Sequence, residues 1–385
     1  MKYYIIAGEA SGDLHGSNLI REIKKLDQQA VFRCWGGDLM QAAGAELVKH
    51  YRELAFMGFT EVIMNLPTIL RNLKNCKEDI LAFKPDTLIL IDYPGFNLRI
   101  AKWAKQQQLR VVYYISPQVW AWKESRVKTI KACVDKMLVI LPFEKEFYKK
   151  WNYDVEYVGH PLVEVVDNFV ANSRESGVDG PELMDDRKGS QLHTPDSRLI
   201  ALLPGSRQQE ILKKLPVMLE VSKQFPGFHF VVAQAPGQED AFYQDLLRDY
   251  PQVSAVRNRT YELLLQSKAA CVTSGTATLE TALFGVPEVI CYKGSAISYQ
   301  IAKKLIRVKY ISLVNLIMDK PVVKELIQDE LTVENLGREL NELLNNEEKK
   351  AQLKKDYSML KDILSQGGHA SANAAKSIVN WLSAF

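Results

Sequence analysis

Short apolar runs that end in turns of small residues and lead into helical periodicity recur along the whole chain. The first run, 3–7, passes through the glycine-rich turn 8–13 into a periodic segment at 14–26. A short run that is apolar throughout predicts a strand covered on both faces, which is typical of parallel sheets. Comparable runs occur at 87–91, 111–116, 137–142, 199–203, 228–233, 269–273 and 289–292. The pattern predicts an α/β protein built on open parallel sheets.

A polar segment divides the chain, and the strand–helix pattern starts again after it. The segment 171–198 mixes charged residues with glycine and proline and shows little periodicity, which predicts a linker or insertion. At 385 residues the chain is also longer than one core usually reaches. We therefore expect an N-terminal domain over 1–170 and a C-terminal domain over 199–365. A final helix, 366–385, is expected to pack back on the first domain.

The charge balance and the cysteine pattern exclude several classes of protein. Lys and Arg number 49 against 46 Asp and Glu, a net charge of +3, so we expect no nucleic-acid partner. The five cysteines include no C-x-x-C pair, which indicates a reducing compartment and no metal site. No apolar run approaches the ~20 residues that span a bilayer. We therefore expect a cytoplasmic protein without a membrane-spanning helix.

The stretch 274–280, which follows the apolar run 269–273, has the composition of a phosphate site. Ser274, Gly275 and Thr276 stand where a strand turns into a helix, so several unpaired backbone N–H groups would point at one spot. Gly275 has no Cβ to block an anion, and Glu280 could accept both hydroxyls of a ribose. The alternative is an ordinary strand-to-helix turn with Thr276 as the cap.

A second candidate for anion binding follows the run 199–203. Gly205, Ser206 and Arg207 form the turn after this strand. Because a guanidinium presents a fork of N–H donors, Arg207 suits a diphosphate leaving group.

Acidic residues follow two predicted strands of the first half. Asp92 stands at the end of the strand 87–91, before a Pro-Gly turn, where a rigidly held general base is expected. Glu9 and Asp13 follow the first strand, and ligands of open α/β sheets bind beyond such strand ends. Both could equally belong to a solvated loop, with Asp13 as a first-turn helix charge. The glycine spacing of 8–13 does not match the G-x-G-x-x-G of nicotinamide sites.

The segment 56–73 carries more apolar side chains than one buried stripe needs. Arg71, Lys74 and Lys77 follow close behind it. An apolar face with flanking cations predicts contact with a membrane surface, whereas periodicity alone favours a core helix. The proposed acyl and membrane contacts are Val62, Met64, Leu66, Ile69, Leu70 and Leu73.

Four of these motifs, taken in order, resemble those of the lipid A disaccharide synthase family. They are GEASGD at 8–13, PQVWAW at 117–122, LLPGSR at 202–207 and SGTATLE at 274–280, accompanied by LPFE at 141–144 and by Asn315. The likeness extends over about 3–331, and the first two motifs together are highly specific. The chain departs from the pattern in a longer linker and in Gly95, which replaces an acidic residue often found there.

The resemblance implies two Rossmann-like domains facing a cleft, the GT-B type of glycosyltransferase fold. It implies an inverting, metal-independent enzyme without cofactor that joins UDP-2,3-diacylglucosamine to 2,3-diacylglucosamine 1-phosphate, called lipid X. The product would be the β-1′,6-linked lipid A disaccharide 1-phosphate, with release of UDP. The enzyme would lie peripherally on the cytoplasmic leaflet of the inner membrane, and a homodimer is compatible with the sequence.

The resemblance also gives each candidate residue a role. Asp92 would act as the general base, and Glu9 would take part in catalysis or position the substrates. Arg207, Gly275 and Thr276 would hold the departing UDP, with Gly205, Ser206 and Ser274 beside them. Glu280 would bind the ribose, and Asn315 would position the donor. Two alternatives stay open, a UDP-sugar 2-epimerase and a non-catalytic protein that binds sugar nucleotides.

Overall fold

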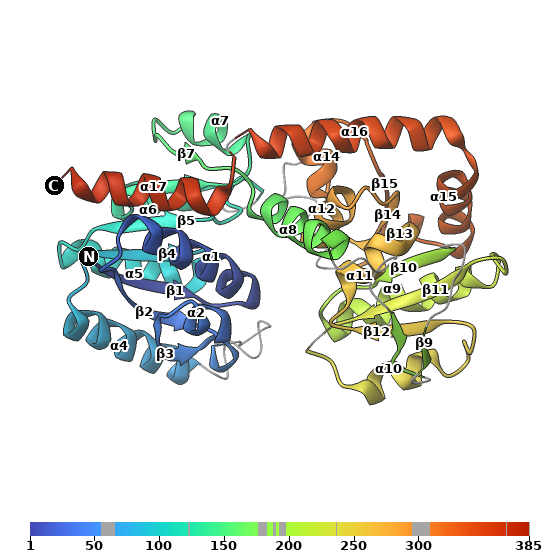
Figure 1. Ribbon diagram of the computed structural model, residues 1–385, viewed down its shortest axis with the longest axis horizontal. Helices are drawn as coiled ribbons and strands as arrows, with labels where there is room; N and C mark the ends of the chain where they lie inside the picture. Colours follow the sequence, from blue (N-terminus) through green and yellow to red (C-terminus); the bar gives the residue numbers. More distant parts are fainter. Residues whose placement is uncertain are drawn as a thin grey trace. The chain divides into compact units, whose positions relative to one another are not determined.

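The computed structural model describes residues 1–54, 66–121, 124–175, 183–187, 190–191, 198–235, 237–294, 309–366 and 368–384. Val62 and Met64 therefore lie outside the described residues. The chain divides into two units, Met1–Pro161 with Leu364–Phe385, and Leu162–Ile363. Each unit is built on its own parallel sheet with helices between the strands, as Figure 1 shows. This arrangement confirms the predicted α/β class.

The first unit contains a sheet of seven strands in the order β3-β2-β1-β4-β5-β6-β7, with all neighbours parallel. The strands are β1 (Lys2–Ala7), β2 (Val31–Gly36), β3 (Glu46–His50), β4 (Thr87–Ile91), β5 (Val111–Tyr114), β6 (Lys136–Val139) and β7 (Glu156–Tyr157). The helices are α1 (Ala10–Leu26), α2 (Asp38–Ala42), η1 (Tyr51–Glu53), α4 (Leu66–Phe83), α5 (Pro94–Gln106), α6 (Arg126–Cys133), α7 (Glu144–Lys149) and α17 (Ala370–Ser383).

The central strands of this sheet are buried on both faces, which explains why their sequences are apolar throughout. Tyr4 and Ile6 of β1 point to the layer formed by α4, α5 and α6. Tyr3 and Ile5 point to the opposite layer, formed by α1 and α17. The side chains alternate because successive residues of a strand face opposite sides of the sheet.

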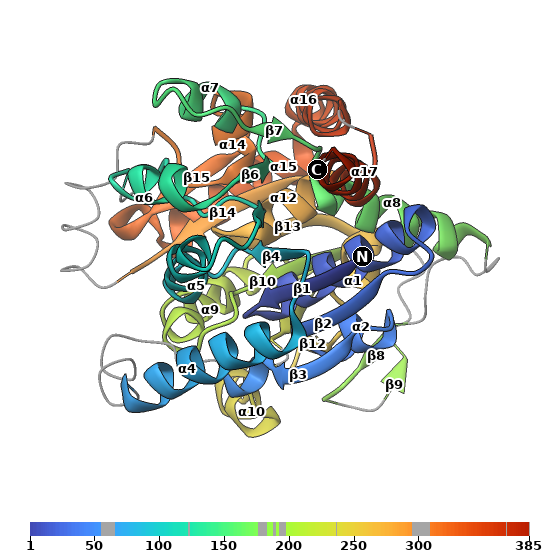
Figure 2. The ribbon, with the colours of Figure 1, turned by 90° about the vertical axis from the view of Figure 1, so that its left-hand side faces the viewer.

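The last helix of the chain belongs to the first unit. α17 packs against α1, and Asn373 on it donates to the carbonyl of Val158, 3.1 Å away. Figure 2 shows the two helices side by side.

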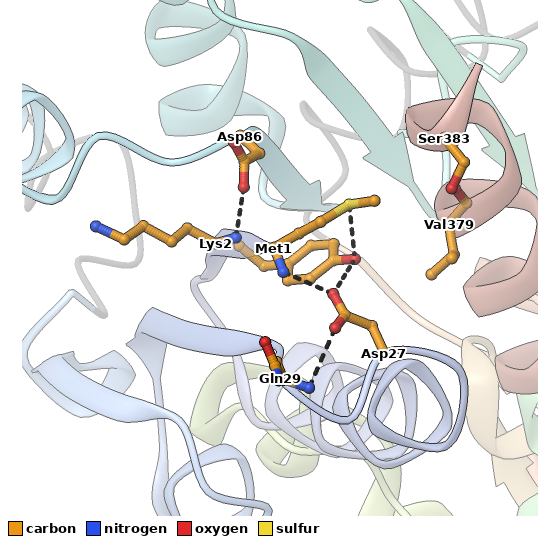
Figure 3. Close-up of polar contacts among 8 residues, drawn as sticks. Met1, Lys2, Asp27, Gln29, Asp86, Val379 and Ser383 are labelled. Carbon is orange, nitrogen blue, oxygen red and sulfur yellow. Dashed lines mark hydrogen bonds and ion pairs between the residues drawn. The ribbon is translucent and has the colours of Figure 1, made fainter. Parts of the chain in front are cut away.

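Polar contacts at the amino end of β1 fix where the strand begins (Figure 3). The amino group of Met1 pairs with Asp27 at 2.8 Å, and the amide of Lys2 donates to Asp86 at 2.7 Å. The hydroxyl of Tyr3 also reaches Asp27, at 3.4 Å. These contacts are structural, whereas ligands of open parallel α/β sheets bind beyond the carboxyl ends of the strands.

The second unit contains a sheet of six strands in the order β12-β11-β10-β13-β14-β15, again parallel. The strands are β10 (Leu199–Leu203), β11 (His229–Gln234), β12 (Ser254–Arg257), β13 (Ser267–Thr273), β14 (Glu288–Tyr292) and β15 (Lys324–Ile327). The helices are α8 (Pro161–Glu175), α9 (Gln208–Ser222), α10 (Asp240–Leu247), α11 (Thr260–Gln266), α12 (Thr276–Leu283), α14 (Leu313–Met318), η2 (Gln328–Glu330), α15 (Val333–Asn345) and α16 (Glu347–Ser365).

The units divide after Pro161, the first residue of α8, whereas the sequence predicted a linker at 171–198. Part of that segment forms two short antiparallel strands, β8 (Met184–Asp185) and β9 (Ser190–Gln191), and β8 packs against β12. The buried carboxylate of Asp185 accepts hydrogen bonds from Ser254 Oγ at 2.8 Å and from the amide of Ala255 at 3.2 Å. This part of the segment is therefore an integral piece of the second unit.

Within the described ranges, none of the helices combines the length and the apolar character that crossing a bilayer requires.

Candidate functional site

Asp92 and Glu9, called here the carboxylate pair, follow the neighbouring strands β4 and β1. The backbone of Asp92 is left-handed, with φ at 41°, and so is that of Tyr93, with φ at 47°. Left-handed backbone at a residue other than glycine costs about 1 kcal/mol or more and persists only when neighbours enforce it. Asn97 enforces it here, because its Nδ2 donates to the carbonyl oxygens of Asp92 at 2.8 Å and Ile91 at 3.1 Å.

A second hydrogen bond and a glycine complete the support of this loop. The hydroxyl of Tyr113 on β5 donates to the Asp92 carbonyl at 2.5 Å. The ring of Tyr93 lies against the turn after β1, where a Cβ on Gly8 would come within 2.4 Å of the ring. Gly8 is therefore required for the ring to pack there. The loop holds Asp92 rigidly at the end of its strand.

The surroundings of Asp92 change its acidity. Burial and, to a smaller extent, the negative charge of Glu9 together raise the pKa of its carboxyl to about 7, against the opposing effect of a hydrogen bond from the Tyr93 backbone. Glu9 itself is exposed. A carboxyl whose pKa lies near 7 can both accept and release a proton at neutral pH, which is the property of a general base.

Asp13, for which the sequence left two interpretations open, has a structural role. It is buried, and its carboxylate accepts the amides of Gly37 at 2.8 Å, Leu39 at 3.1 Å and Met40 at 3.0 Å. These bonds satisfy the first turn of α2 and tie it to α1.

Ser274, Gly275 and Thr276, called here the amide turn, connect β13 to α12. Gly275 has φ at 152°, and a Cβ there would meet no described atom within 4 Å. None of the described side chains caps the start of α12, and Ser274 Oγ donates instead to the carbonyl of Ile311 at 2.9 Å. A helix start without a side-chain cap leaves backbone amides available to an anion.

Arg207 lies at the same edge of the sheet as the amide turn, because β10 and β13 are paired neighbours. Its guanidinium is exposed and lies 3.7 Å from the carboxylate of Glu210. Gly205 has φ at 113°, which lets the chain turn sharply after β10, and Ser206 is exposed. The guanidinium can therefore move to meet an anion.

Glu280 lies half-buried on α12. The hydroxyl of Tyr261 on α11 donates to its Oε1 at 2.8 Å. Burial raises the pKa of Glu280, and this hydrogen bond opposes the rise. The sequence analysis missed Tyr261, because a tyrosine in an ordinary helical pattern gives no signal of a partner on another helix.

Asn315 is buried, and its side chain is used within the protein. Its Oδ1 accepts the amide of Val323 at 2.9 Å, and its Nδ2 donates to the carbonyl of Val323 at 2.9 Å and to Glu325 at 3.0 Å. Glu325 also accepts the amides of Ile311 and Ser312. This network supports the segment that receives Ser274, and a direct contact of Asn315 with a donor stays a prediction. Sequence reasoning missed Glu325.

The predicted membrane contacts do not share one environment. Leu70 is 57% exposed, whereas Leu73 is 7% exposed and belongs to the core of the first unit. Ile69 is half-buried and packs against the same core. Leu66 begins α4, and Val62 and Met64 precede the described part. The assignment of Leu73 to lipid contact is therefore corrected, because its side chain completes the packing of α4 on the sheet.

Among the side chains that the structure describes, no group of three His, Cys, Asp or Glu residues could hold a metal ion.

Comparison with known families gives a match over almost the whole chain. A family model described as lipid-A-disaccharide synthetase matches residues 3–381. The lipid-A-disaccharide synthase of Geobacter metallireducens is 40% identical over 369 residues, covering 94% of this chain and 93% of that protein. The enzyme of Syntrophus aciditrophicus is 39% identical, and the match covers 97% of this chain and 96% of that protein. The enzyme of Coxiella burnetii is 37% identical, and the match covers 98% of this chain and 97% of that protein.

Solved structures show the same fold at low sequence identity. A UDP-GlcNAc 2-epimerase from Neisseria meningitidis, bound to UDP-GlcNAc, superposes with a TM-score of 0.69 at 14% identity over 100% of both chains. The glycotransferase of kitacinnamycin has a TM-score of 0.63 at 14% identity and covers 99% of both chains. At these identities the likeness extends to the fold alone.

Proposed function

This chain belongs to the lipid-A-disaccharide synthase family, and from that premise we propose that it joins UDP-2,3-diacylglucosamine to 2,3-diacylglucosamine 1-phosphate (lipid X). The product is the β-1′,6-linked lipid A disaccharide 1-phosphate, and UDP is released. The family makes the enzyme a glycosyltransferase of lipid A biosynthesis. Its two parallel α/β sheets are of the GT-B type.

Asp92 is the general base in this proposal. The donor sugar is α-linked to UDP and the product is β-linked, so the 6-hydroxyl oxygen of the acceptor attacks C1 of the donor from the opposite face. The C1–oxygen bond to UDP breaks as the new bond forms, and the hydroxyl proton passes to Asp92. One observation supports this assignment. The pKa of the Asp92 carboxyl is raised to about 7, and hydrogen bonds from Asn97 and Tyr113 hold its loop rigid.

The amide turn and Arg207 stabilise the leaving UDP in this proposal. Negative charge develops on the diphosphate as the bond breaks, and preorganised N–H donors stabilise such charge without reorganising. The uncapped start of α12 follows β13, and the exposed guanidinium of Arg207 follows the neighbouring strand β10. Glu280 accepts the ribose hydroxyls, and Glu9 and Asn315 act by positioning.

The membrane contact is also part of the proposal. Leu70 on α4 is exposed, and Arg71 and Lys74 beside it are exposed cations. In the proposal Leu70, with the sequence-predicted contacts Val62, Met64, Leu66 and Ile69, enters the cytoplasmic leaflet of the inner membrane, so that the acyl chains of the substrates need not cross water. A homodimer is compatible with the proposal, and its presence is decided by sedimentation velocity.

One experiment tests the reaction and the base together. The wild-type enzyme is mixed with both diacylated sugars, and the lipid products are analysed by mass spectrometry. We expect the disaccharide 1-phosphate and an equal amount of UDP. Asp92→Asn should form product about 10²–10⁴-fold more slowly, because the general base is lost, while binding UDP like the wild type. A rate within tenfold of the wild type would exclude Asp92 as the base.

A control separates this function from that of the structural neighbours. An epimerase acts on UDP-N-acetylglucosamine alone, whereas the proposed enzyme needs a lipid acceptor. We expect no change in UDP-N-acetylglucosamine incubated alone with the protein. Conversion of this sugar nucleotide, or UDP binding without turnover of the diacylated pair, would contradict the proposal.

A further inference from the structure

Tyr261 belongs to a cluster of three aromatic rings in the second unit. Its ring packs edge-on against Phe169 of α8, with ring centres 5.3 Å apart, and is tilted against Phe284 with centres 5.1 Å apart. Phe169 and Phe284 also contact each other, at 6.1 Å. Packing against two neighbouring rings restricts the rotation of the Tyr261 ring and gives its hydroxyl a preferred direction.

That direction is toward Glu280. The hydroxyl donates to Oε1 at 2.8 Å, the distance of a normal O–H···O bond. Burial and the charge of Glu280 raise the pKa of Tyr261 well above its usual value, so its hydroxyl keeps the proton and stays a donor.

We propose that Tyr261 is a positioning residue for ribose recognition, which fixes the Glu280 carboxylate in the orientation that accepts the two hydroxyls of a UDP ribose. The inference rests on the proposed function, because it deepens the role given there to Glu280. A carboxylate oxygen has two lone pairs, so Oε1 accepts Tyr261 and one ribose hydroxyl at once, and Oε2 accepts the other.

Glu280 needs such a partner because the last side-chain torsion of a glutamate has only a weak preference for any one angle. This torsion joins an sp³ carbon to a planar carboxylate and has broad minima. Without a partner the carboxylate must be ordered when the ligand binds, and that cost reduces affinity. With Tyr261 in place the cost is met during folding.

The test measures dissociation constants for UDP and for 2′,3′-dideoxy-UDP, which lacks both ribose hydroxyls. The variants are Tyr261→Phe, which keeps the ring, and Glu280→Ala. The matched control is Tyr250→Phe, which removes another tyrosine hydroxyl that donates to a glutamate, Glu220 on α9. Binding is followed by calorimetry, and circular dichroism compares the folded content.

We expect Tyr261→Phe to weaken UDP binding about tenfold, as for loss of a hydrogen bond to a charged group, and to leave dideoxy-UDP binding unchanged. Tyr250→Phe should bind both nucleotides like the wild type. If Tyr261→Phe still binds dideoxy-UDP, the variant is folded. The ratio of its dissociation constants for UDP and dideoxy-UDP does not depend on the fraction of the protein that is active. Equal losses for both nucleotides, or no loss for UDP, would overturn the inference.

The Glu280→Ala variant separates this inference from the proposed function. It should bind the two nucleotides with nearly equal affinity. If it prefers UDP as strongly as the wild type does, the ribose contact itself is wrong and the inference fails with it. If it loses the preference while Tyr261→Phe keeps it, only the positioning role fails.

Discussion

Asp92 shows how a single residue can be placed in a costly environment for a chemical purpose. Its backbone is left-handed, its carboxyl is half-buried, and Glu9 adds a like charge. Each of these features destabilises the folded protein in which Asp92 is ionised. The hydrogen bonds from Asn97 and Tyr113 to its carbonyl oxygen offset part of that cost.

The charge of Glu9 predicts a shift in the pH dependence of the reaction. A base must be deprotonated to act, so kcat/KM of the wild type should rise with pH through about 7, the raised pKa of Asp92. Removing the like charge in Glu9→Gln lowers that pKa. The rising limb should therefore move to lower pH, by about 0.5–1 unit.

The pH profile of Glu9→Gln is measured from pH 5 to 9 with saturating donor. Glu22→Gln, on the last turns of the same helix, is the control and should keep the wild-type profile. If the rising limb of the kcat/KM profile of Glu9→Gln stays at the wild-type pH, or moves to higher pH, the coupling between the two carboxyls is contradicted.

At the scale of the element, α4 contains two neighbouring leucines with opposite roles. Leu70 is exposed and Leu73 is in the core. The sequence left a membrane contact and a core helix open for this region. In the helix each side chain faces either the core or the outside according to its position in the 3.6-residue period. The inner face carries Leu73, Cys76 and Ile80.

These two leucines should respond differently to substitution. Leu70→Ser should change stability by less than about 0.5 kcal/mol, as expected at an exposed position, and should weaken binding to vesicles that contain phosphatidylglycerol. Leu73→Ser should lower the free energy of unfolding by about 2–5 kcal/mol because it leaves a cavity in the core. Leu81→Ser, exposed near the other end of α4, is the control for vesicle binding. Unchanged vesicle sedimentation of Leu70→Ser would count against the membrane face.

The amide turn depends on one backbone conformation. Gly275 adopts φ 152° and ψ −161°, a region that only glycine enters readily. Gly275→Ala should therefore cost about 1–3 kcal/mol of stability and weaken UDP binding, because the turn must change shape. A Cβ on Gly95 in α5 meets open space, so Gly95→Ala should leave both properties intact. Thermal melting and calorimetry with UDP check both variants, and equal effects of the two would refute the explanation.

Local patterns predicted the strands better than they predicted the contacts between elements. The run 87–91 became β4 and the run 199–203 became β10, because burial on both faces requires continuous apolar sequence. Asp13 could not be assigned, since its partners Gly37 and Met40 are distant in sequence. Tyr261 escaped for the same reason, and the two-residue strands β8 and β9 are too short to have a period.

At the scale of the whole molecule, the first unit is built from two segments that are far apart in the sequence. The first unit contains Met1–Pro161 and also Leu364–Phe385, while the second unit lies between them in sequence. α17 contributes Ala374, Ile378 and Leu382 to the core beneath β1 and β4. The cover of this face of the first sheet, begun by α1, is therefore complete only when α17 is in place.

This dependence predicts a local loss of stability. Ile378→Ala should destabilise the first unit by about 2–5 kcal/mol, as for other truncations of buried aliphatic side chains. Hydrogen exchange should speed up in β1 and β4 and stay slow in β10 and β13, because those strands have their own core. Asn380→Ala, exposed on the same helix, is the control. A uniform increase in both sheets would show that the two units unfold together.

The position of α17 also has a consequence for synthesis on the ribosome. Protein domains generally fold in the order in which they are translated. Here the half that emerges first must wait with one side of its sheet only partly covered, by α1 and α2, until α17 has been made. Burial of that side is thus tied to synthesis of α17, and a polypeptide that stops before this helix would expose an apolar surface that chaperones and proteases recognise.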